Sequence, residues 1–149
     1  MAVVTNITPA RFAELVGPLS GLPVAAVWLA DYTALYVEVG SVVDAYDSGR
    51  ARAEYSVYLG FDWVFDPKHG SSLTSDERDA KTRIADLLAH QSVASVAPTL
   101  AGELEIRFDS GDRIRSADGD ADPDWSIHLP RGRCVAVEAG SLVIEAERA

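Results

Sequence analysis

The chain has 149 residues, and segments of its second half resemble segments of its first half at an offset of 69 residues. Three segments of the first half match segments of the second: 19–27 matches 88–96, 35–39 matches 104–108 and, after one inserted residue, 54–59 matches 124–129. The matches fall mostly at apolar positions, where packing in a core restricts residue type. Self-similarity on this scale is typical of two copies of one supersecondary unit.

Capping and periodicity signals in the first half predict one helix followed by strands. Thr8 is a suitable N-cap, and Pro9 fits the first helical position, where no N–H is needed. Alternation between residues 35 and 39 predicts a strand with one covered face and one wetter face that carries Tyr36 and Glu38. The predicted strands are 24–29, 34–39 and 53–65, and the predicted loops are 44–52 and 66–72.

The second half repeats this order. The segment from Thr74 to Glu77 fits a capping box and predicts a helix that continues to about His90. Polar turn residues at 109–112 and 138–141 separate short apolar segments that are typical of hairpins. The predicted strands are 93–97, 103–108, 113–115, 125–129, 133–138 and 142–145.

These elements predict an α+β fold. We expect two tandem helix-plus-antiparallel-strand repeats, at about residues 8–66 and 74–146, which form one β-rich domain over residues 1–149. A duplicated unit of this kind predicts pseudo-twofold symmetry. The two meanders would pack sheet against sheet or join at their edges, with helices on the exposed face.

The chain is acidic, with a formal net charge of −10. Phosphate binding requires a basic surface, so nucleic acid and anionic membranes are not expected as partners. A basic protein partner fits this charge, because opposite fields accelerate encounter. The competing explanation is solubility alone, for which many proteins are acidic.

The single cysteine, Cys134, excludes an internal disulfide and is typical of a reducing compartment. Residues 1–12 lack the basic start and apolar stretch of a secretory signal, and the apolar segments are too short to span a bilayer. We therefore expect a cytoplasmic protein.

The densest acidic cluster alternates with small residues and comprises Asp118, Asp120, Asp122 and Asp124. Alternating carboxylates can bind Ca²⁺, but Pro123 and Leu129 stand where the calcium-binding loop requires Gly and Glu. We therefore predict no metal and no cofactor. The cluster fits either a solvated turn or an acidic loop that contacts a basic partner, and the second interpretation is preferred.

Three aromatic residues with acidic neighbours are candidate anchors for a partner. Aromatic side chains ringed by polar groups are common at the energetic centre of interfaces. The alternation in residues 53–65 equally fits a core strand, in which the aromatic side chains would be buried. The candidate groups are Trp63 with Asp62 and Asp66, Trp125 with Asp124, and Tyr32 with Asp31, near Trp28.

The sequence contains no nucleophile elbow and no phosphate-binding loop, so we expect no enzyme. A second hypothesis is a small-molecule or catalytic site between the repeats, made by His128, Tyr58, Arg133 and Cys134. A third is a structural homodimer that pairs exposed edge strands.

Several motifs resemble a family of small uncharacterised bacterial two-repeat proteins, some of whose relatives are labelled as immunity proteins of polymorphic toxin systems. The resemblance covers roughly residues 19–144. It rests on Leu19, Gly21 and Val24, on residues 35–39, on Asp62-Trp63, on residues 102–111 and on Asp124-Trp125. Asp124 stands where the family tends to have glutamate. The resemblance implies a fold and a role in toxin neutralisation, and it implies no catalytic residues.

Together these observations lead us to expect a non-catalytic binding protein. The resemblance implies an immunity protein whose acidic face occludes the active site of a basic toxin domain.

Overall fold

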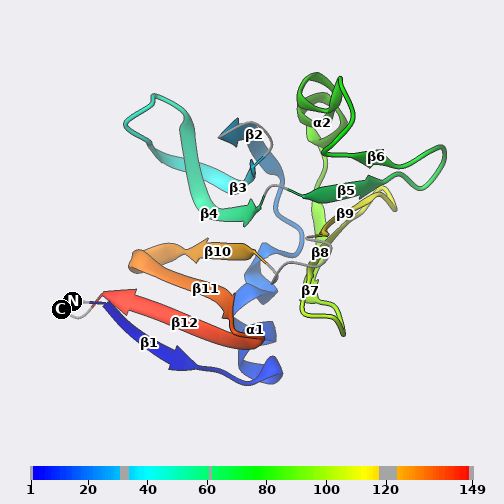
Figure 1. Cartoon of the computed structure of the whole chain (residues 1–149). Helices are drawn as coiled ribbons and strands as arrows, with labels where there is room; N and C mark the ends of the chain where they lie inside the picture. Colours follow the sequence, from blue (N-terminus) through cyan, green and yellow to red (C-terminus); the bar gives the residue numbers. More distant parts are fainter. Residues whose placement is uncertain (1, 31–33, 61, 118–123, 148–149) are drawn as a thin grey trace.

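The computed structural model describes residues 2–30, 34–60, 62–117 and 124–147. They form a β-rich α+β fold with two antiparallel sheets (Figure 1). The larger sheet has seven strands in the order β1-β12-β11-β10-β4-β3-β2. Its strands are β1 (Ala2–Asn6), β2 (Val24–Ala30), β3 (Ala34–Ala45), β4 (Ala51–Leu59), β10 (Trp125–Leu129), β11 (Arg133–Glu138) and β12 (Ser141–Glu147).

The smaller sheet has five strands in the order β6-β5-β9-β8-β7. Its strands are β5 (Trp63–Asp66), β6 (Leu73–Thr74), β7 (Val93–Pro98), β8 (Leu104–Phe108) and β9 (Arg113–Ser116). Each sheet therefore contains strands from both halves of the chain. This differs from the expected pair of self-contained meanders, because the chain changes sheet between β4 and β5 and changes back between β9 and β10.

The first helix forms as predicted. In α1 (Pro9–Val16) the Thr8 hydroxyl accepts a hydrogen bond from Arg11 N at 3.1 Å, and Pro9 occupies the first turn. Phe12 on this helix meets Trp125 edge-to-face, with ring centroids 5.8 Å apart. A 3₁₀ turn, η1 (Gly17–Leu19), then carries Leu19 into the interior between the sheets.

The predicted capping box is wrong. The second helix, α2 (Ala80–Leu88), begins later, at an N-cap (Asp79) that makes no side-chain hydrogen bond. Thr74 instead lies in β6, where it pairs with Val64 of β5. Ser75 extends that pairing, because its N–H donates a hydrogen bond to Trp63 O at 3.0 Å. Strand pairing thus uses the residues that the sequence pattern assigned to a helix start.

Three further boundaries differ from prediction. The predicted loop 44–52 is shorter in the structure, since β3 runs to Ala45 and β4 starts at Ala51, which leaves residues 46–50 as the hairpin loop. The predicted strand 53–65 is divided near Gly60, after which the chain enters the other sheet. The strand β1, which no sequence signal predicted, pairs with β12 at the edge of the larger sheet. A further 3₁₀ turn, η2 (Pro130–Gly132), joins β10 to β11.

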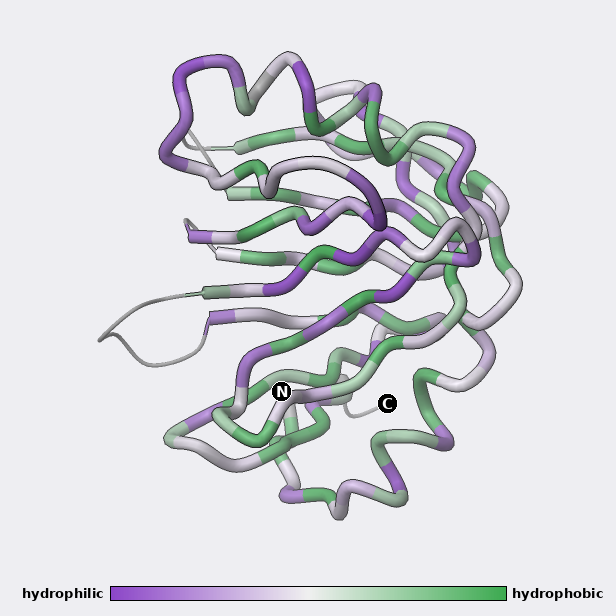
Figure 2. Tube along the Cα trace, turned by 90° about the vertical axis from the view of Figure 1, so that its right-hand side faces the viewer, coloured by the Kyte–Doolittle hydropathy of each residue, from purple (hydrophilic) through white to green (hydrophobic). Residues whose placement is uncertain are grey.

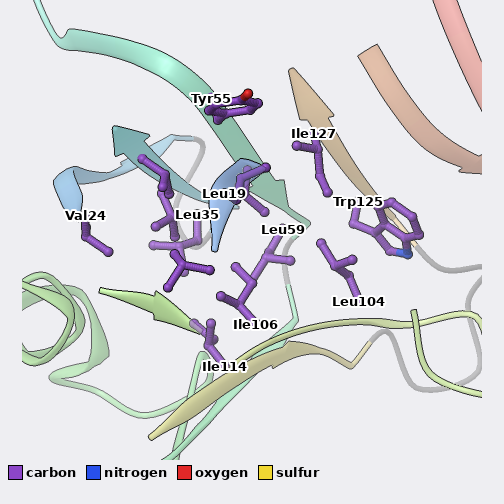
Figure 3. Close-up of a cluster of buried hydrophobic side chains, with 14 of the residues drawn as sticks. Leu19, Val24, Leu35, Tyr55, Leu59, Leu104, Ile106, Ile114, Trp125 and Ile127 are labelled. Carbon is purple, nitrogen blue, oxygen red and sulfur yellow. The ribbon is translucent and has the colours of Figure 1, made fainter. Parts of the chain in front are cut away.

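One hydrophobic core fills the space between the sheets (Figure 3). Alternate residues of β3, β4, β8 and β10 supply it, including Leu35, Leu59, Leu104 and Ile127, each fully buried. Hydrophobic and hydrophilic residues alternate along several strands of the Cα trace (Figure 2), as expected for sheets with one covered face. No described helix combines the length and apolar character needed to cross a membrane.

The segments that enter β2 and β7 run antiparallel and are bonded to each other. Val24 N donates to Gln91 O and Val93 N donates to Leu22 O, both at 2.9 Å. The same 69-residue offset relates the two bonds. It also relates the two register shifts, which lie between Val24 and Ala26 in β2 and at the corresponding place in β7.

Candidate functional site

The described ends of the two connections between the sheets are hydrogen-bonded to each other. Gly60 N donates to Asp124 O at 2.9 Å, and Ala117 N donates to Asp62 O at 3.0 Å. The Asp124 side chain packs over Gly60 so closely that a Cβ at that glycine would lie 2.6 Å from Asp124 Oδ2. We call the four described residues at these ends, Gly60, Asp62, Ala117 and Asp124, the acidic crossover.

The acidic crossover brings together two of the predicted partner-binding residues. Asp124 is exposed and Asp62 is half-buried. A hollow of about 260 Å³ at Asp62 is lined by Asp62, Ala117 and the exposed Asp76, among others. The predicted contact residues Asp118, Asp120, Asp122, Asp31 and Tyr32 lie outside the described residues.

The two tryptophan anchors are corrected by the structure. Trp63 and Trp125 expose 1% and 2% of their surfaces and belong to the core. The Trp125 indole donates to Gly102 O at 2.8 Å, which satisfies its one polar atom internally. Neither side chain is available as a surface anchor, because each lies on the core-facing side of its strand.

Asp66, another predicted contact residue, is bound within its own sheet. Its Oδ2 accepts from Arg113 Nε at 3.1 Å and from Arg115 Nε at 3.4 Å, and Oδ1 accepts from the Ser72 hydroxyl. Partial burial alone would raise the pKa of Asp66, but the hydrogen bond from Ser72 and the two arginines lower it. The charge of Asp66 is therefore neutralised locally, so this residue would contribute little to the attraction of a basic partner.

A second cluster lies on the outer face of the larger sheet, opposite the core. It is a cavity of about 280 Å³, which we call the aromatic niche, and its lining residues are Trp28, Tyr36, Tyr46, Arg52 and His128. The Trp28 and Tyr36 rings stack with centroids 4.0 Å apart and planes at 1°. Tyr46 meets Trp28 edge-on at 5.2 Å.

Glu38 lies beside the niche and exposes 0% of its surface. Burying a carboxylate is costly unless hydrogen bonds replace its hydration. Four groups bond to it: the Ser56 hydroxyl at 2.6 Å, Ala53 N at 3.0 Å, the Tyr46 hydroxyl at 3.2 Å and Trp28 Nε1 at 3.3 Å. The carboxylate thus fixes two of the aromatic walls.

The β3–β4 hairpin must fold back to close the niche. Eight residues of straight strand would separate Glu38 from Tyr46 by roughly 26 Å at about 3.3 Å per residue. Register shifts between Val39 and Val42 and between Val42 and Asp44 bend the hairpin. Gly40 has a φ of +97°, a left-handed conformation that favours glycine, at the start of this bend. The bend brings the tyrosine hydroxyl onto the buried carboxylate.

The environment of the niche favours the neutral forms of Tyr46 and His128. Burial raises the pKa of Tyr46, and the Glu38 charge adds to this effect, so the hydroxyl remains a donor. Desolvation lowers the pKa of His128, and the positive charge of Arg52 lowers it further. The imidazole is exposed at the mouth of the niche and can act as a neutral hydrogen-bonding group there.

Of the four residues predicted for a site between the repeats, three share this outer face. His128 pairs with Ser56 and with Cys134 across neighbouring strands, and Tyr58 lies in the next row, its ring 5.0 Å from Tyr36. Arg133 pairs with Leu129, a core residue, so it lies on the opposite face.

Cys134 is not activated as a nucleophile. Burial raises the pKa of its thiol, and the nearby Glu145 charge acts in the same direction. Among the described residues, no group of three or more His, Cys, Asp or Glu side chains could hold a metal ion.

Sequence reasoning placed Glu38 on a wetter face and did not identify Tyr46 or Arg52 as site residues. The available signal was Gly40, a glycine within a strand, which is typical of a bulge. A bulge can turn a hairpin back over its own sheet and bury a polar residue there.

Comparisons with protein-family models, curated proteins and solved structures found no match for this chain.

Proposed function

We propose that the chain is a non-catalytic binding protein that docks a basic protein partner through the acidic crossover. The observation that carries this proposal is the pair of hydrogen bonds that joins Gly60 to Asp124 and Ala117 to Asp62. These bonds join the two ends of the most acidic segment of the chain, Ala117 and Asp124, to Asp62 and Gly60. Asp62 adds a further carboxylate there. A net charge of −10 would accelerate encounter with a basic surface.

We further propose that the partner is a bacterial toxin domain whose active site is occluded, with the protein acting in the cytoplasm as an immunity protein. The resemblance of the sequence motifs motivates this role. Carboxylates at the crossover would take the place of substrate phosphates or other anions in a basic cleft. With Trp63 and Trp125 in the core, the affinity would depend mainly on charge.

We also propose that the fold is a duplicated unit with pseudo-twofold symmetry, in which each half exchanges strands with the other. Three features related by the same offset support it: the paired bonds at Val24 and Val93, the shared register shifts, and the bonds from Gly40 N to Pro23 O and from Asp109 N to Ser92 O. In this arrangement the crossover is the place where the exchanged strands pass each other.

Calorimetry with the protein encoded beside this gene tests the binding function. The double variant Asp62→Asn/Asp124→Asn should bind at least tenfold more weakly, a loss of about 1.4 kcal/mol or more. The matched double variant Asp86→Asn/Asp109→Asn removes the same charge from exposed positions elsewhere and should bind nearly as well as the wild type. Raising the ionic strength should weaken wild-type binding more than that of the crossover variant.

Two outcomes would overturn the proposal. One is the absence of binding to that protein. The other is an equal loss of affinity in both double variants, which would mean that overall charge acts without a defined surface.

A further inference from the structure

The aromatic niche is a cavity closed by the chain's own bent hairpin, and the proposed docking function does not use it. Its walls are the rings of Trp28, Tyr36 and Tyr46. The bonds to Glu38 hold two of these rings, so the cavity is largely pre-formed. Ligand sites in proteins are typically pre-formed, mostly apolar clefts with a few placed polar groups.

The charges around the niche favour an anion over a cation. Within the described residues, the Arg52 guanidinium makes no hydrogen bond or ion pair, although it lines the cavity. A second guanidinium, Arg50, already lies over the Trp28 ring at 5.3 Å from its centroid. Of the carboxylates near the cavity among the described residues, Glu38 is fully engaged by its four partners, and Glu145 lies close enough to His128 to act on its pKa. A cationic ligand would meet the like charges of Arg50 and Arg52, and the buried Glu38 carboxylate is already occupied by its own donors.

The size of the niche limits the ligand to about one ring. Its volume of about 280 Å³ lies just below the range of roughly 300–1,000 Å³ that holds drug-sized ligands. A planar ring can pack against Tyr46 and against the edges of the stacked Trp28–Tyr36 pair, and a terminal anionic group can reach Arg52, which also lines the cavity.

We propose that the aromatic niche binds a small aromatic carboxylate. The ring packs against Tyr46 and the stacked Trp28–Tyr36 pair. The carboxylate accepts hydrogen bonds from Arg52, and the His128 imidazole donates a further one. This site is independent of the acidic crossover, so either can be refuted without the other.

Titration of the ¹⁵N-labelled protein with benzoate, followed by NMR, tests the site. The Trp28 indole N–H signal should shift and saturate, while those of the buried Trp63 and Trp125 should change little. Benzylammonium, which has the ring with the opposite charge, and acetate, which has the charge without the ring, should each bind at least tenfold more weakly. The pKa of His128 should rise when benzoate is bound, because a nearby anion stabilises the imidazolium form.

The variant Arg52→Gln should weaken benzoate binding by tenfold or more, since a charge-assisted bidentate contact is lost. Arg131→Gln removes an equal charge from an exposed turn outside the niche and should bind as the wild type does. His128→Gln should weaken binding less than Arg52→Gln. Well-dispersed spectra of all three variants would show that each is folded.

Three results would overturn the proposal: no saturable shift at Trp28, benzylammonium binding as tightly as benzoate, or equal affinity of the Arg52→Gln and Arg131→Gln variants. Acetate binding as tightly as benzoate would also overturn it, because the ring would then contribute nothing.

Discussion

The Glu38 carboxylate is fully buried on the outer face of the larger sheet, where tyrosine, tryptophan and serine side chains surround it. Among the described residues it forms no ion pair with an arginine or lysine, and hydrogen bonds from four donors take the place of its hydration. Each donor comes from a different part of β2, β4 or the hairpin end. Glu38 therefore links β2, β4 and the end of the β3–β4 hairpin, which the sequence pattern alone does not place together.

Replacing Glu38 by glutamine should destabilise the protein by about 2–3 kcal/mol. The amide keeps the shape of the side chain, but its NH₂ group faces hydrogen-bond donors in place of an acceptor. The measurement is the free energy of unfolding from urea denaturation.

The matched control is Glu14→Gln. Glu14 exposes 68% of its side chain and pairs with Arg11 at 2.9 Å on the surface of α1. Exposed pairs contribute little, so this variant should stay within about 0.5 kcal/mol of the wild type. A Glu38→Gln variant as stable as Glu14→Gln would contradict the role assigned to the buried carboxylate.

At the scale of the element, the start of α2 shows why a strong local signal can be wrong. Residues 74–77 have the spacing of a capping box, yet Thr74 is paired in β6 and Ser75 is buried. The Ser75 hydroxyl accepts a hydrogen bond from Trp63 N at 3.1 Å, which satisfies a backbone donor of β5. Pairing with the preceding strand, β5, outweighs the local capping preference.

Because residues 74 and 75 take part in strand pairing and not in a helix cap, we expect two variants to differ in their free energy of unfolding. Ser75→Ala should lower the free energy of unfolding by about 1–2 kcal/mol, because a buried N–H loses its acceptor. Thr74→Ala should lower it by only a few tenths of a kcal/mol, since no helix cap is lost. Thermal and urea unfolding of both variants measure the ranking, and a larger loss for Thr74→Ala would favour the capping box.

Local patterns predicted the elements better than they predicted the partners of those elements. The cap at Thr8 and the buried alternation from Leu35 to Val39 followed from sequence and are confirmed. The change of sheet after Gly60 and the return of Tyr46 to Glu38 did not follow, since the first depends on contact with Asp124 and the second on the bend of the β3–β4 hairpin. The acidic segment was evident from sequence, but the position of its ends beside Asp62 required the topology.

At the scale of the whole molecule, the sheets are shared between the two halves of the chain. The larger sheet joins β4 of the first half to β10 of the second, and the smaller sheet joins β5 to β9. Neither sheet is complete within one half. The exchange is accompanied by one core that both halves share and by hydrogen bonds between the described ends of the two connections.

The most direct test of the shared sheets divides the chain in the exposed turn before α2, giving fragments 1–77 and 78–149. Circular dichroism and urea denaturation are measured on each fragment alone and on an equimolar mixture. Neither fragment alone should unfold cooperatively, and mixing should restore a cooperative transition and the native spectrum. Cooperative unfolding of either fragment by itself would contradict the exchange of strands and would indicate two self-contained repeats.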